Sequence, residues 1–497
     1  MSVRSVALAT LAAVAFAVGL RPGPFGLLTV LASALLAAAL AAARTRRAAT
    51  FATFLAALGP GTVAAIPLAP LAPLAVLPVA ATYAATFALA GAAAGPARPG
   101  AGLSPGRTGR FLATWAALEG LLALEVGAWV GRPGLSLPYL TLGAGLADTP
   151  WRAVGALAGP RGTTLAVLGG GFALAHLAQA VRARRPRTIG TAALPLAALA
   201  ATPLLAAAVP NDAPPSDAPP GDASPADAAH LAVRLVQHAP REAELAAARF
   251  DASIAQGHAA ALRRATLAPE ADGSAPTDRL VVWPEGILPR PLADLGSPPA
   301  HLPSGVDVVF GAGRRVEGGV ANAALAWRDG RLTVLADKRR TVPFGEPDLV
   351  RGEPRPPTRL HGADVAVLSC WEVAFPEAAR EAARAGADAL IVLANDAYAA
   401  GGPVTALHMR QARLRAAEVG LPVVFVQATG PSGAFDAAGD GLVRLPAGVP
   451  AWRDAQVPLG GRATPFRATG DAPWTASLAV LAGGLLARGR PGKGGEA

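Results

Sequence analysis

The sequence contains a single cysteine, Cys370, among 497 residues. One thiol cannot form a disulfide within the chain, so a disulfide framework is excluded and cysteine usage does not reveal the redox state of the compartment. Lysine is almost as scarce, because Lys338 and Lys493 are the only two and arginine supplies the other positive side-chain charges. Charged residues make up only 16% of the chain and apolar residues 52%, a composition that favours a membrane protein with a polar domain attached.

Acidic residues are nearly absent from residues 1–210, where Glu119, Glu125 and Asp148 accompany 15 arginines. These charges give this part a net charge of +12, and the total of +10 leaves −2 for the rest of the chain. Basic charge that is confined to the apolar part favours membrane topology over a nucleic-acid surface. We therefore expect a membrane as a partner and no nucleic acid.

Long uncharged runs predict membrane-spanning helices, for which about 20 apolar residues are needed. The runs are Ser5–Leu20, Pro22–Ala43, two within the proline-broken tract Ala48–Ala97, Phe111–Val130, Gly162–Val181, Ile189–Pro210 and a short last one at Ala472–Ala487. The sequence thus predicts seven spans before a polar domain and one after it.

Arginines cluster in alternate connections between these runs, at residues 44–47, 98–110 and 182–187. Because short cytoplasmic loops are enriched in basic residues, all three connections should be cytoplasmic. The N-terminus is then inside and the segment after Pro210 outside, and the tail returns to the cytoplasm. We expect a multi-pass protein of the cell (inner) membrane with its polar domain on the outer, periplasmic side.

Two carboxylates, Glu119 and Glu125, fall within the fifth run. Ionisable groups at membrane depth are functional candidates by default. The alternative is that one or both lie near an interface and pair with Arg110 or Arg132.

The segment from 211 to 230, NDAPPSDAPPGDASPADAAH, repeats aspartate every five residues among prolines and predicts an extended linker. From 231 to 470, short apolar runs alternate with helical segments, the first of which is expected from Arg241 to about Leu267. This pattern is typical of an α/β domain of layered sheets. We expect residues 1–210 to form the membrane domain, 231–470 the catalytic domain, and 471–497 a C-terminal transmembrane helix with a cytoplasmic tail.

Three different reactive groups follow strand-like runs in this domain. Glu285 ends LVVWPE, Lys338 ends LTVLADK and Cys370 ends ADVAVLSC. A carboxylate, an ammonium and a thiol are the parts of an acyl-transfer site that works through a thioester. The alternative is that Cys370 is a small buried hydrophobe, as most free cysteines are.

The motifs around these residues resemble the Glu, Lys and Cys of the carbon-nitrogen hydrolase (nitrilase) superfamily. They are WPEG at 283–286, VPFGE at 342–346, CWE at 370–372, LAND at 393–396, His408, ARLRAAE at 412–418 and TGPSG at 429–433. VPFGE, the preceding membrane part and the final span make the chain similar to the apolipoprotein N-acyltransferase family within it. This resemblance implies a multi-pass α-helical membrane domain and an α/β outer domain with a nitrilase-like α-β-β-α sandwich.

The resemblance also implies a reaction. A phospholipid donates an acyl chain to Cys370, and the thioester passes it to the amine of a diacylated apolipoprotein. Glu285 would be the base, and Lys338 would stabilise the thiolate and the oxyanion. The further residues are Glu346 and Glu372, which orient Lys338 or act as fold-supporting ion pairs, and the substrate-binding candidates Phe344, Trp371, Asn395 and His408. No metal and no cofactor are expected.

Some positions depart from the family pattern. The segment 397–400 replaces an aromatic residue and a glycine, Leu407 replaces a glutamine, and Ala428 replaces an asparagine. Two alternatives stay open: a membrane-tethered amidase or nitrilase, in which water attacks the thioester, and a membrane scaffold whose outer domain is inactive.

Overall fold

The structure, a computed structural model, describes residues 2–66, 69–70, 73–97, 103–123, 141–207, 211–212, 229–248, 251–269, 279–286, 305–342, 346–400 and 402–489. The chain divides into two compact units. The first unit comprises Met1–Glu125, Ser136–Ala206 and Thr469–Ala497, and the second comprises Val126–Leu135 and Ala207–Ala468.

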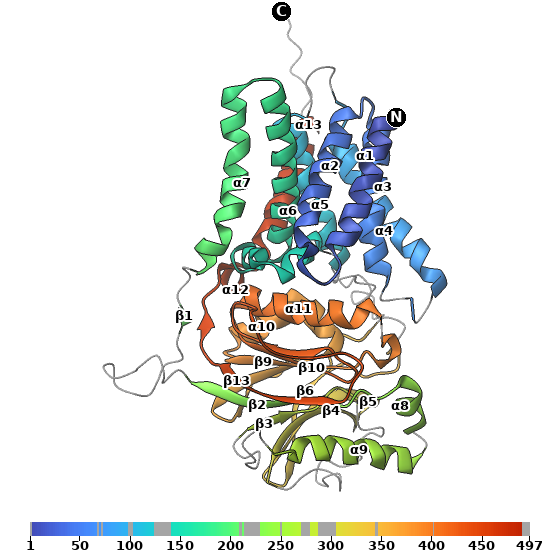
Figure 1. Cartoon of the computed structure of the whole chain (residues 1–497), viewed down its shortest axis with the longest axis vertical. Helices are drawn as coiled ribbons and strands as arrows, with labels where there is room; N and C mark the ends of the chain where they lie inside the picture. Colours follow the sequence, from blue (N-terminus) through green and yellow to red (C-terminus); the bar gives the residue numbers. More distant parts are fainter. Residues whose placement is uncertain are drawn as a thin grey trace, which may run out of the picture. The chain divides into compact units, whose positions relative to one another are not determined.

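The first unit is helical (Figure 1). Its α-helices are α1 Val3–Gly19, α2 Leu28–Ala42, α3 Arg46–Ala65, α4 Val76–Ala94, α5 Pro105–Ala123, α6 Val154–Arg182, α7 Pro186–Ala207 and α13 Ala472–Gly489. Short 3₁₀ turns precede several of them: η1 Pro24–Leu27, η3 Pro73–Ala75, η6 Leu142–Asp148 and η7 Pro150–Ala153. A helix thus covers each of the eight predicted runs within the described residues.

Four helical segments are long and apolar enough to cross a membrane, by length and composition. They are Pro24–Ala42, Arg46–Ala65, Pro73–Ala94 and Pro150–Arg182. The expected α-helical membrane part is therefore confirmed as a set of membrane-compatible helices. The count of eight spans, the linker boundaries and the sidedness stay predictions.

Alanine is the commonest residue in the core of the first unit and lets the helices approach closely, and leucines and large aromatic rings fill most of the rest. Phe87 contacts Trp115 with a centroid distance of 4.3 Å, and Phe111 stacks on Phe172 at 5.0 Å. These rings join α4, α5 and α6.

Glu119 on α5 is buried, and its Oε1 accepts a hydrogen bond of 2.9 Å from the backbone N–H of Leu142. Arg110, the alternative partner considered for Glu119, donates instead to the carbonyl groups of Ala93 and Ala94. Glu125 and Arg132 lie outside the described residues.

The second unit contains two six-stranded sheets. One has the strand order β13-β2-β3-β4-β5-β6, and the other β12-β11-β10-β9-β8-β7. The strands of the first sheet are β2 His230–Gln237, β3 Leu280–Val282, β4 Asp307–Val316, β5 Gly319–Arg328, β6 Arg331–Asp337 and β13 Ala451–Pro458. Those of the second sheet are β7 Thr358–Leu360, β8 Ala363–Ser369, β9 Ala389–Ala394, β10 Val423–Gln427, β11 Ser432–Phe435 and β12 Gly441–Leu445.

The two sheets face each other across an aliphatic core (Figure 1). Residues from both sheets, such as Val233 and Val282 from one and Val365 and Ile391 from the other, belong to the same buried cluster. Helices α10 Pro376–Arg384 and α11 Pro403–Val419 cover the outer face of the second sheet, and α8 Glu242–Ala248 and α9 Ala252–Leu267 cover that of the first. This is the expected α-β-β-α sandwich.

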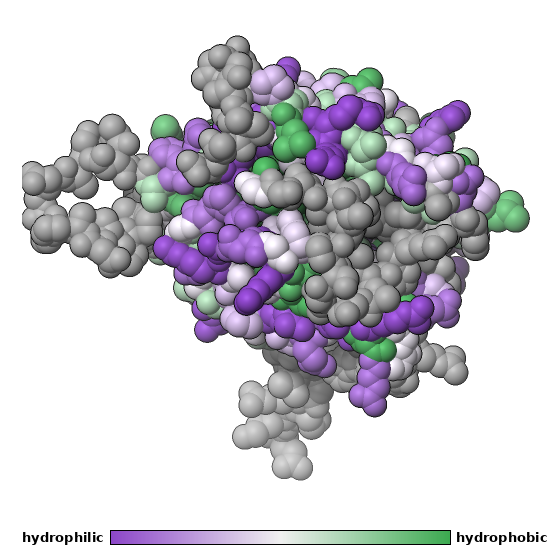
Figure 2. Space-filling view, turned by 90° about the horizontal axis from the view of Figure 1, so that it is seen from below, coloured by the Kyte–Doolittle hydropathy of each residue, from purple (hydrophilic) through white to green (hydrophobic). Residues whose placement is uncertain are grey.

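Figure 2 shows the unit from the side of α9, where hydrophilic residues predominate among the coloured ones. The apolar runs predicted as buried strands, such as β9 and β10, are buried along their whole length.

The local predictions differ from the structure in a few places. The single helix expected from Arg241 to Leu267 is two helices, α8 and α9. Strands β7, β11, β12 and β13 were not predicted. The runs TRL and SGAF of β7 and β11 are too short for a periodicity to be seen, whereas β13, AWRDAQVP, is eight residues long but mostly only partly buried and forms no apolar run. The start of the predicted linker, Asn211–Asp212, pairs as strand β1 with β14 Gly461–Arg462, and residues 213–228 lie outside the described residues.

Candidate active site

Three neighbouring parallel strands bring one half of the site together. Strands β8, β9 and β10 are parallel, with Ser369 beside Leu393 and Gln427 beside Ala394. Because the carboxyl ends of parallel strands lie at the same edge of a sheet, Cys370, Asp396 and Gln427 meet there. Cys370 begins the 3₁₀ helix η9, Cys370–Ala374, and is buried.

The other sheet supplies the second half. Glu285 follows β3, Lys338 follows β6, and Asn322 lies on β5 between them in sequence. A side chain at Gly311 on β4 would approach the Cα of Glu285 to 2.6 Å, so only glycine allows the backbone that carries Glu285 to pass this close. Glycine at this position therefore helps to place the carboxylate.

Lys338 is buried and bridges two carboxylates. Its Nζ donates to Oε1 of Glu285 at 3.0 Å and to Oε1 of Glu346 at 2.8 Å. Asn322 Nδ2 also donates to Oε1 of Glu285 at 2.7 Å. The Cys370 thiol lies near enough to the Glu285 carboxyl group and the Lys338 ammonium for these groups to shift its pKa, so the three residues predicted from sequence are brought together.

Burial and charge set the protonation of this group. Burial raises the pKa of Glu285 above its ordinary value, although the Lys338 ammonium opposes the shift. Burial and the negative charge of Glu285 raise the pKa of Cys370 well above its usual range. Burial tends to lower the pKa of Lys338, but the charges of Glu285, Cys370 and Glu346 outweigh it and raise that pKa. The resting site therefore holds a neutral thiol beside a permanent ammonium, and the thiol needs a base.

The two supporting carboxylates have different contacts. Glu346 contacts Lys338 as expected, and its Oε2 accepts from the backbone N–H of Val342 at 2.8 Å. Glu372 was expected to orient Lys338 or to form a fold-supporting ion pair. In the described residues its oxygens accept hydrogen bonds from the backbone N–H groups of Ser369, Arg339 and Arg340. Glu372 therefore ties the segment after Lys338 to the turn that carries Cys370.

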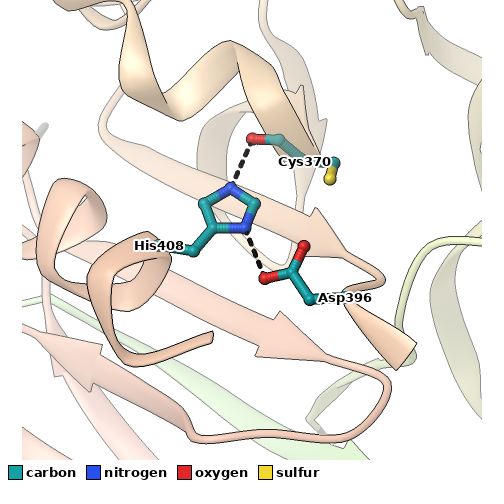
Figure 3. Close-up of side chains that lie close together, drawn as sticks. All are labelled: Cys370, Asp396 and His408. Carbon is teal, nitrogen blue, oxygen red and sulfur yellow. Dashed lines mark hydrogen bonds and ion pairs between the residues drawn. The ribbon is translucent and has the colours of Figure 1, made fainter. Parts of the chain in front are cut away.

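His408, near the start of α11, forms a chain of hydrogen bonds with Asp396 and Cys370 (Figure 3). Its Nδ1 lies 2.8 Å from Oδ2 of Asp396, and its Nε2 lies 2.9 Å from the carbonyl oxygen of Cys370. His408 was predicted to bind substrate, but both of its ring nitrogens contact the protein.

Cys370, Asp396 and His408 each offer one potential metal-ligand atom, and these atoms lie within 4.8 Å of one another. Both nitrogens of His408 face oxygen acceptors, so the ring acts here as a hydrogen-bond donor and presents no lone pair to a cation. The arrangement favours hydrogen bonding over metal ligation.

The other predicted binding residues are placed as follows. Trp371 is half-buried and packs edge-on against Phe375 with a centroid distance of 6.1 Å. Asn395 lies beside Gly286, because a Cβ on that glycine would be 3.5 Å from Asn395 Nδ2. Asn395 therefore borders the segment that carries Glu285, whereas Phe344 lies outside the described residues. The substrate-binding roles of these three residues stay predictions.

Sequence reasoning missed Asn322 and Gln427. Gln427 Nε2 donates to Oδ2 of Asp396 at 2.6 Å. Both residues follow or lie within apolar strands, NAALAW and PVVFVQ, and a buried amide in such a run is a signal that could have marked them.

The sequence of residues 312–453 matches the carbon-nitrogen hydrolase family. The chain is 32% identical over 242 residues to an apolipoprotein N-acyltransferase of Rhizobium meliloti, which covers 42% of this chain and 44% of that protein. It is 35% identical over 127 residues to an apolipoprotein N-acyltransferase of Shewanella oneidensis, which covers 25% of this chain and 23% of that protein. The alignments thus span less than half the length of these relatives.

Among solved structures, a carbon-nitrogen hydrolase superfamily protein of Xanthomonas campestris with an arsenic adduct in its active site is 22% identical, with a TM-score of 0.36. That comparison covers 50% of this chain and 97% of the other. The sequence match includes Lys338 and Cys370, whereas Glu285 precedes the matched residues. Residues 312–453 thus match the carbon-nitrogen hydrolase family, in a chain that is similar over 42% of its length to an apolipoprotein N-acyltransferase.

Proposed function

We propose that this protein is an N-acyltransferase that moves an acyl chain from a phospholipid to the N-terminal amine of a diacylated lipoprotein through a thioester on Cys370. The observation that carries the proposal is the buried contact of Lys338 with Glu285 beside the Cys370 thiol. The similarity to apolipoprotein N-acyltransferases supports the choice of substrates.

In the first half of the reaction, Glu285 takes the proton of the Cys370 thiol, and the thiolate attacks the ester carbonyl of the phospholipid. The raised pKa of Glu285 makes it a stronger base than an exposed carboxylate. The Lys338 ammonium, held between Glu285 and Glu346, stabilises the negative oxygen of the tetrahedral intermediate. Collapse breaks the ester bond, and the lysophospholipid leaves with the proton from Glu285.

In the second half, the lipoprotein amine attacks the thioester carbonyl. Glu285 accepts a proton from the nitrogen, an amide bond forms, and the carbon–sulfur bond breaks. The released Cys370 thiolate regains the proton, so the site returns to its starting state. In each half-reaction Glu285 first accepts a proton and then returns it. One carboxylate can therefore serve as the base and the acid of both half-reactions.

The membrane-compatible helices support lipid substrates. Both proposed substrates carry acyl chains, so they must reach Cys370 from the bilayer. We propose that the chain is a multi-pass protein of the inner membrane with its catalytic domain on the periplasmic side, and that α13 returns the tail to the cytoplasm. Reporter fusions at the 211–230 linker and at the C-terminus should then report opposite sides. The same side for both would contradict the final span.

The test of function uses the purified full-length protein in mixed micelles with acyl-labelled phospholipid and a diacylated lipopeptide. Transfer of the label to the peptide as an amide is the expected result. Release of labelled fatty acid without amide formation would replace the transferase by a hydrolase. Release of neither product would favour an inactive scaffold.

A second candidate is a membrane-tethered carbon-nitrogen hydrolase, which the match to that family favours. In this case water takes the place of the amine, and an acid is the product. The same site would perform both reactions, so exclusion of water from the thioester decides between them. Omitting the lipopeptide separates the two candidates, because a transferase then accumulates the acyl-enzyme whereas a hydrolase keeps turning over.

A further inference from the structure

The Asp396–His408 pair has no role in the acyl transfer described above, although both residues are buried beside Cys370. The two ring nitrogens of His408 face two acceptors, a carboxylate oxygen and a backbone carbonyl oxygen (Figure 3). A neutral imidazole carries one N–H group and could donate to only one of them. The geometry therefore fits a ring with protons on both nitrogens, an imidazolium paired with the Asp396 carboxylate.

The surroundings of the pair favour this charge state. Oδ2 of Asp396 accepts a second hydrogen bond from Gln427 on the neighbouring strand, which suits an ionised carboxylate. The ring of Phe425 lies edge-on to His408 at 5.3 Å, and Glu285 adds a negative charge to the same environment. Burial alone would lower the pKa of His408, but Asp396 and the two hydrogen bonds outweigh burial and raise that pKa.

The carbonyl group that His408 holds belongs to the strained residue of the site. Cys370 has a φ angle of +50°, in the left-handed region that residues other than glycine seldom adopt. A hydrogen bond from a charged donor to the Cys370 carbonyl is well placed to stabilise this conformation. Because the peptide group is planar, the same bond also fixes the direction of the Trp371 N–H.

We propose that Asp396 and His408 form a positioning pair, a buried carboxylate–imidazolium couple that holds the backbone of the nucleophile Cys370 and itself adds no net charge beside its sulfur. The other charges near this thiol are those of Glu285, Lys338 and Glu346. The charge balance follows from distance, since potential ligand atoms of the three residues lie within 4.8 Å of one another. Asp396 alone would oppose a thiolate and an oxyanion at this site, and the imidazolium cancels that effect.

This inference rests on the proposed role of Cys370 as a nucleophile, but its test needs no lipid. The probe is iodoacetamide, which alkylates the thiolate, and the full-length protein in detergent is assayed across pH 5 to 10 by intact mass. Four proteins are compared: wild type, His408→Gln, Asp396→Asn, and the double variant. Alkylation can behave as expected whether or not acyl transfer occurs, so failure of this inference and failure of the proposed function are distinguishable.

The expected pattern follows from charge. His408→Gln leaves the Asp396 carboxylate uncompensated, so the apparent pKa of the thiol rises and alkylation at pH 7 falls roughly tenfold or more, as for loss of a nearby opposite charge. The double variant removes both charges, so the apparent pKa of its thiol should return most of the way to the wild-type value. The hydrogen bond to the Cys370 carbonyl is not restored. A purely structural role predicts that the double variant is at least as impaired as His408→Gln.

The matched control is the half-buried pair His361–Asp307, with a 3.1 Å contact between His361 Nε2 and Asp307 Oδ2. His361 lies in the turn before β8, at the opposite end of that strand from Cys370. His361→Asn should leave the alkylation profile unchanged. An unchanged profile in His408→Gln as well, or no recovery in the double variant, would overturn the proposal.

A measurement on the wild type guards against variants that do not fold. Side-chain ¹⁵N NMR of histidine-labelled protein should show one imidazolium that remains doubly protonated above pH 7.5, and this signal should be absent from Asp396→Asn. If every histidine is neutral at pH 7.5, the charged pair does not exist and the proposal is wrong.

Discussion

Buried polar side chains are satisfied locally in the helical unit and over long distances in the sandwich unit. In the helical unit, many hydroxyl groups donate to the carbonyl four residues earlier on their own helix. These donors are Ser33, Thr50, Thr53, Thr62, Thr82, Thr86, Thr114, Thr163, Thr202 and Ser477. The exceptions, buried residues that bond to other segments, include Ser5, Arg107, Glu119, Arg161 and Thr164.

In the sandwich unit, the partners come from different elements. Lys338 and Glu285 are 53 positions apart, and His408 and Cys370 are 38 apart. A hydroxyl that bonds to a carbonyl of its own helix makes no contact with another segment through that bond. Its removal should therefore have little effect on the rest of the fold. A buried charge that bonds to a charged group on a distant segment leaves that group unpaired when it is removed, which is costly. We therefore expect substitutions of these hydroxyl groups in the helical unit to be tolerated better than substitutions of the buried charges in the sandwich unit.

The largest effect is expected at the nucleophile. Cys370→Ala should abolish acylation of the protein by phospholipid, and Cys370→Ser should do nearly the same because a hydroxyl is far harder to ionise than a thiol. Intact mass after incubation with phospholipid measures the acyl-enzyme, and hydroxylamine should remove the acyl group from the wild type. Acylation that persists in Cys370→Ala, or that resists hydroxylamine, would contradict the thioester.

The next effect concerns the lysine between the two carboxylates. Lys338→Arg and Lys338→Met should each lower the single-turnover rate of acylation by roughly 100-fold, as for loss of an oxyanion donor, because a planar guanidinium does not fit the place of a compact ammonium. Melting curves recorded in parallel control for folding. Near-native turnover of Lys338→Arg would mean that Lys338 only neutralises Glu285 and Glu346.

A smaller effect is expected at Asn322, which donates to Glu285. Asn322→Leu removes a hydrogen bond that favours the carboxylate, so the pKa of Glu285 should rise further. The acid limb of the pH–rate profile should then move to higher pH, with a loss of roughly tenfold at pH 6 if the shift is one unit. An acid limb in the wild-type position would show that Glu285 is not the group that titrates there.

The Asp396–His408 pair should make stability depend on pH. Because the folded pKa of His408 is raised above its ordinary value of 6.5, the pair's contribution is fully present below pH 6.5 and is lost as pH rises through the folded pKa. The difference in melting temperature between wild type and His408→Gln should therefore be largest near pH 6 and shrink in alkaline solution. A difference that grows with pH would have the wrong sign for an imidazolium.

The smallest effects test the comparison of the two units directly. Thr53→Val removes a bond to the Ala49 carbonyl on the same helix, and the cost should be near the 0.6 kcal/mol that is about average for hydrogen bonds in a membrane protein. Thr266→Val removes the partner of the buried Trp283 indole N–H, 17 positions away, and should cost about 1–3 kcal/mol. If denaturant unfolding shows that both variants lose the same free energy of unfolding, then local and long-range hydrogen bonds do not differ in this way.

The sequence by itself determined the helices and most of the strands, because long apolar runs and short apolar runs between helical segments are local patterns that burial enforces. It also marked Glu285, Lys338 and Cys370, since each stands directly after or close behind a buried strand, where loops leave the sheet. The family resemblance supplied the expectation that they act together.

Only the tertiary structure decided which groups meet. The pairing of β8 with β9 brings Asp396 beside Cys370, and the order of β3, β4, β5 and β6 within the other sheet brings Asn322 and Lys338 to the Glu285 carboxylate. It also decided that Glu372 holds backbone N–H groups and that His408 holds the Cys370 carbonyl. Such partners are tens of residues apart, and strand order, register and loop closure bring them together, none of which is encoded in the local periodicity from which the elements were predicted.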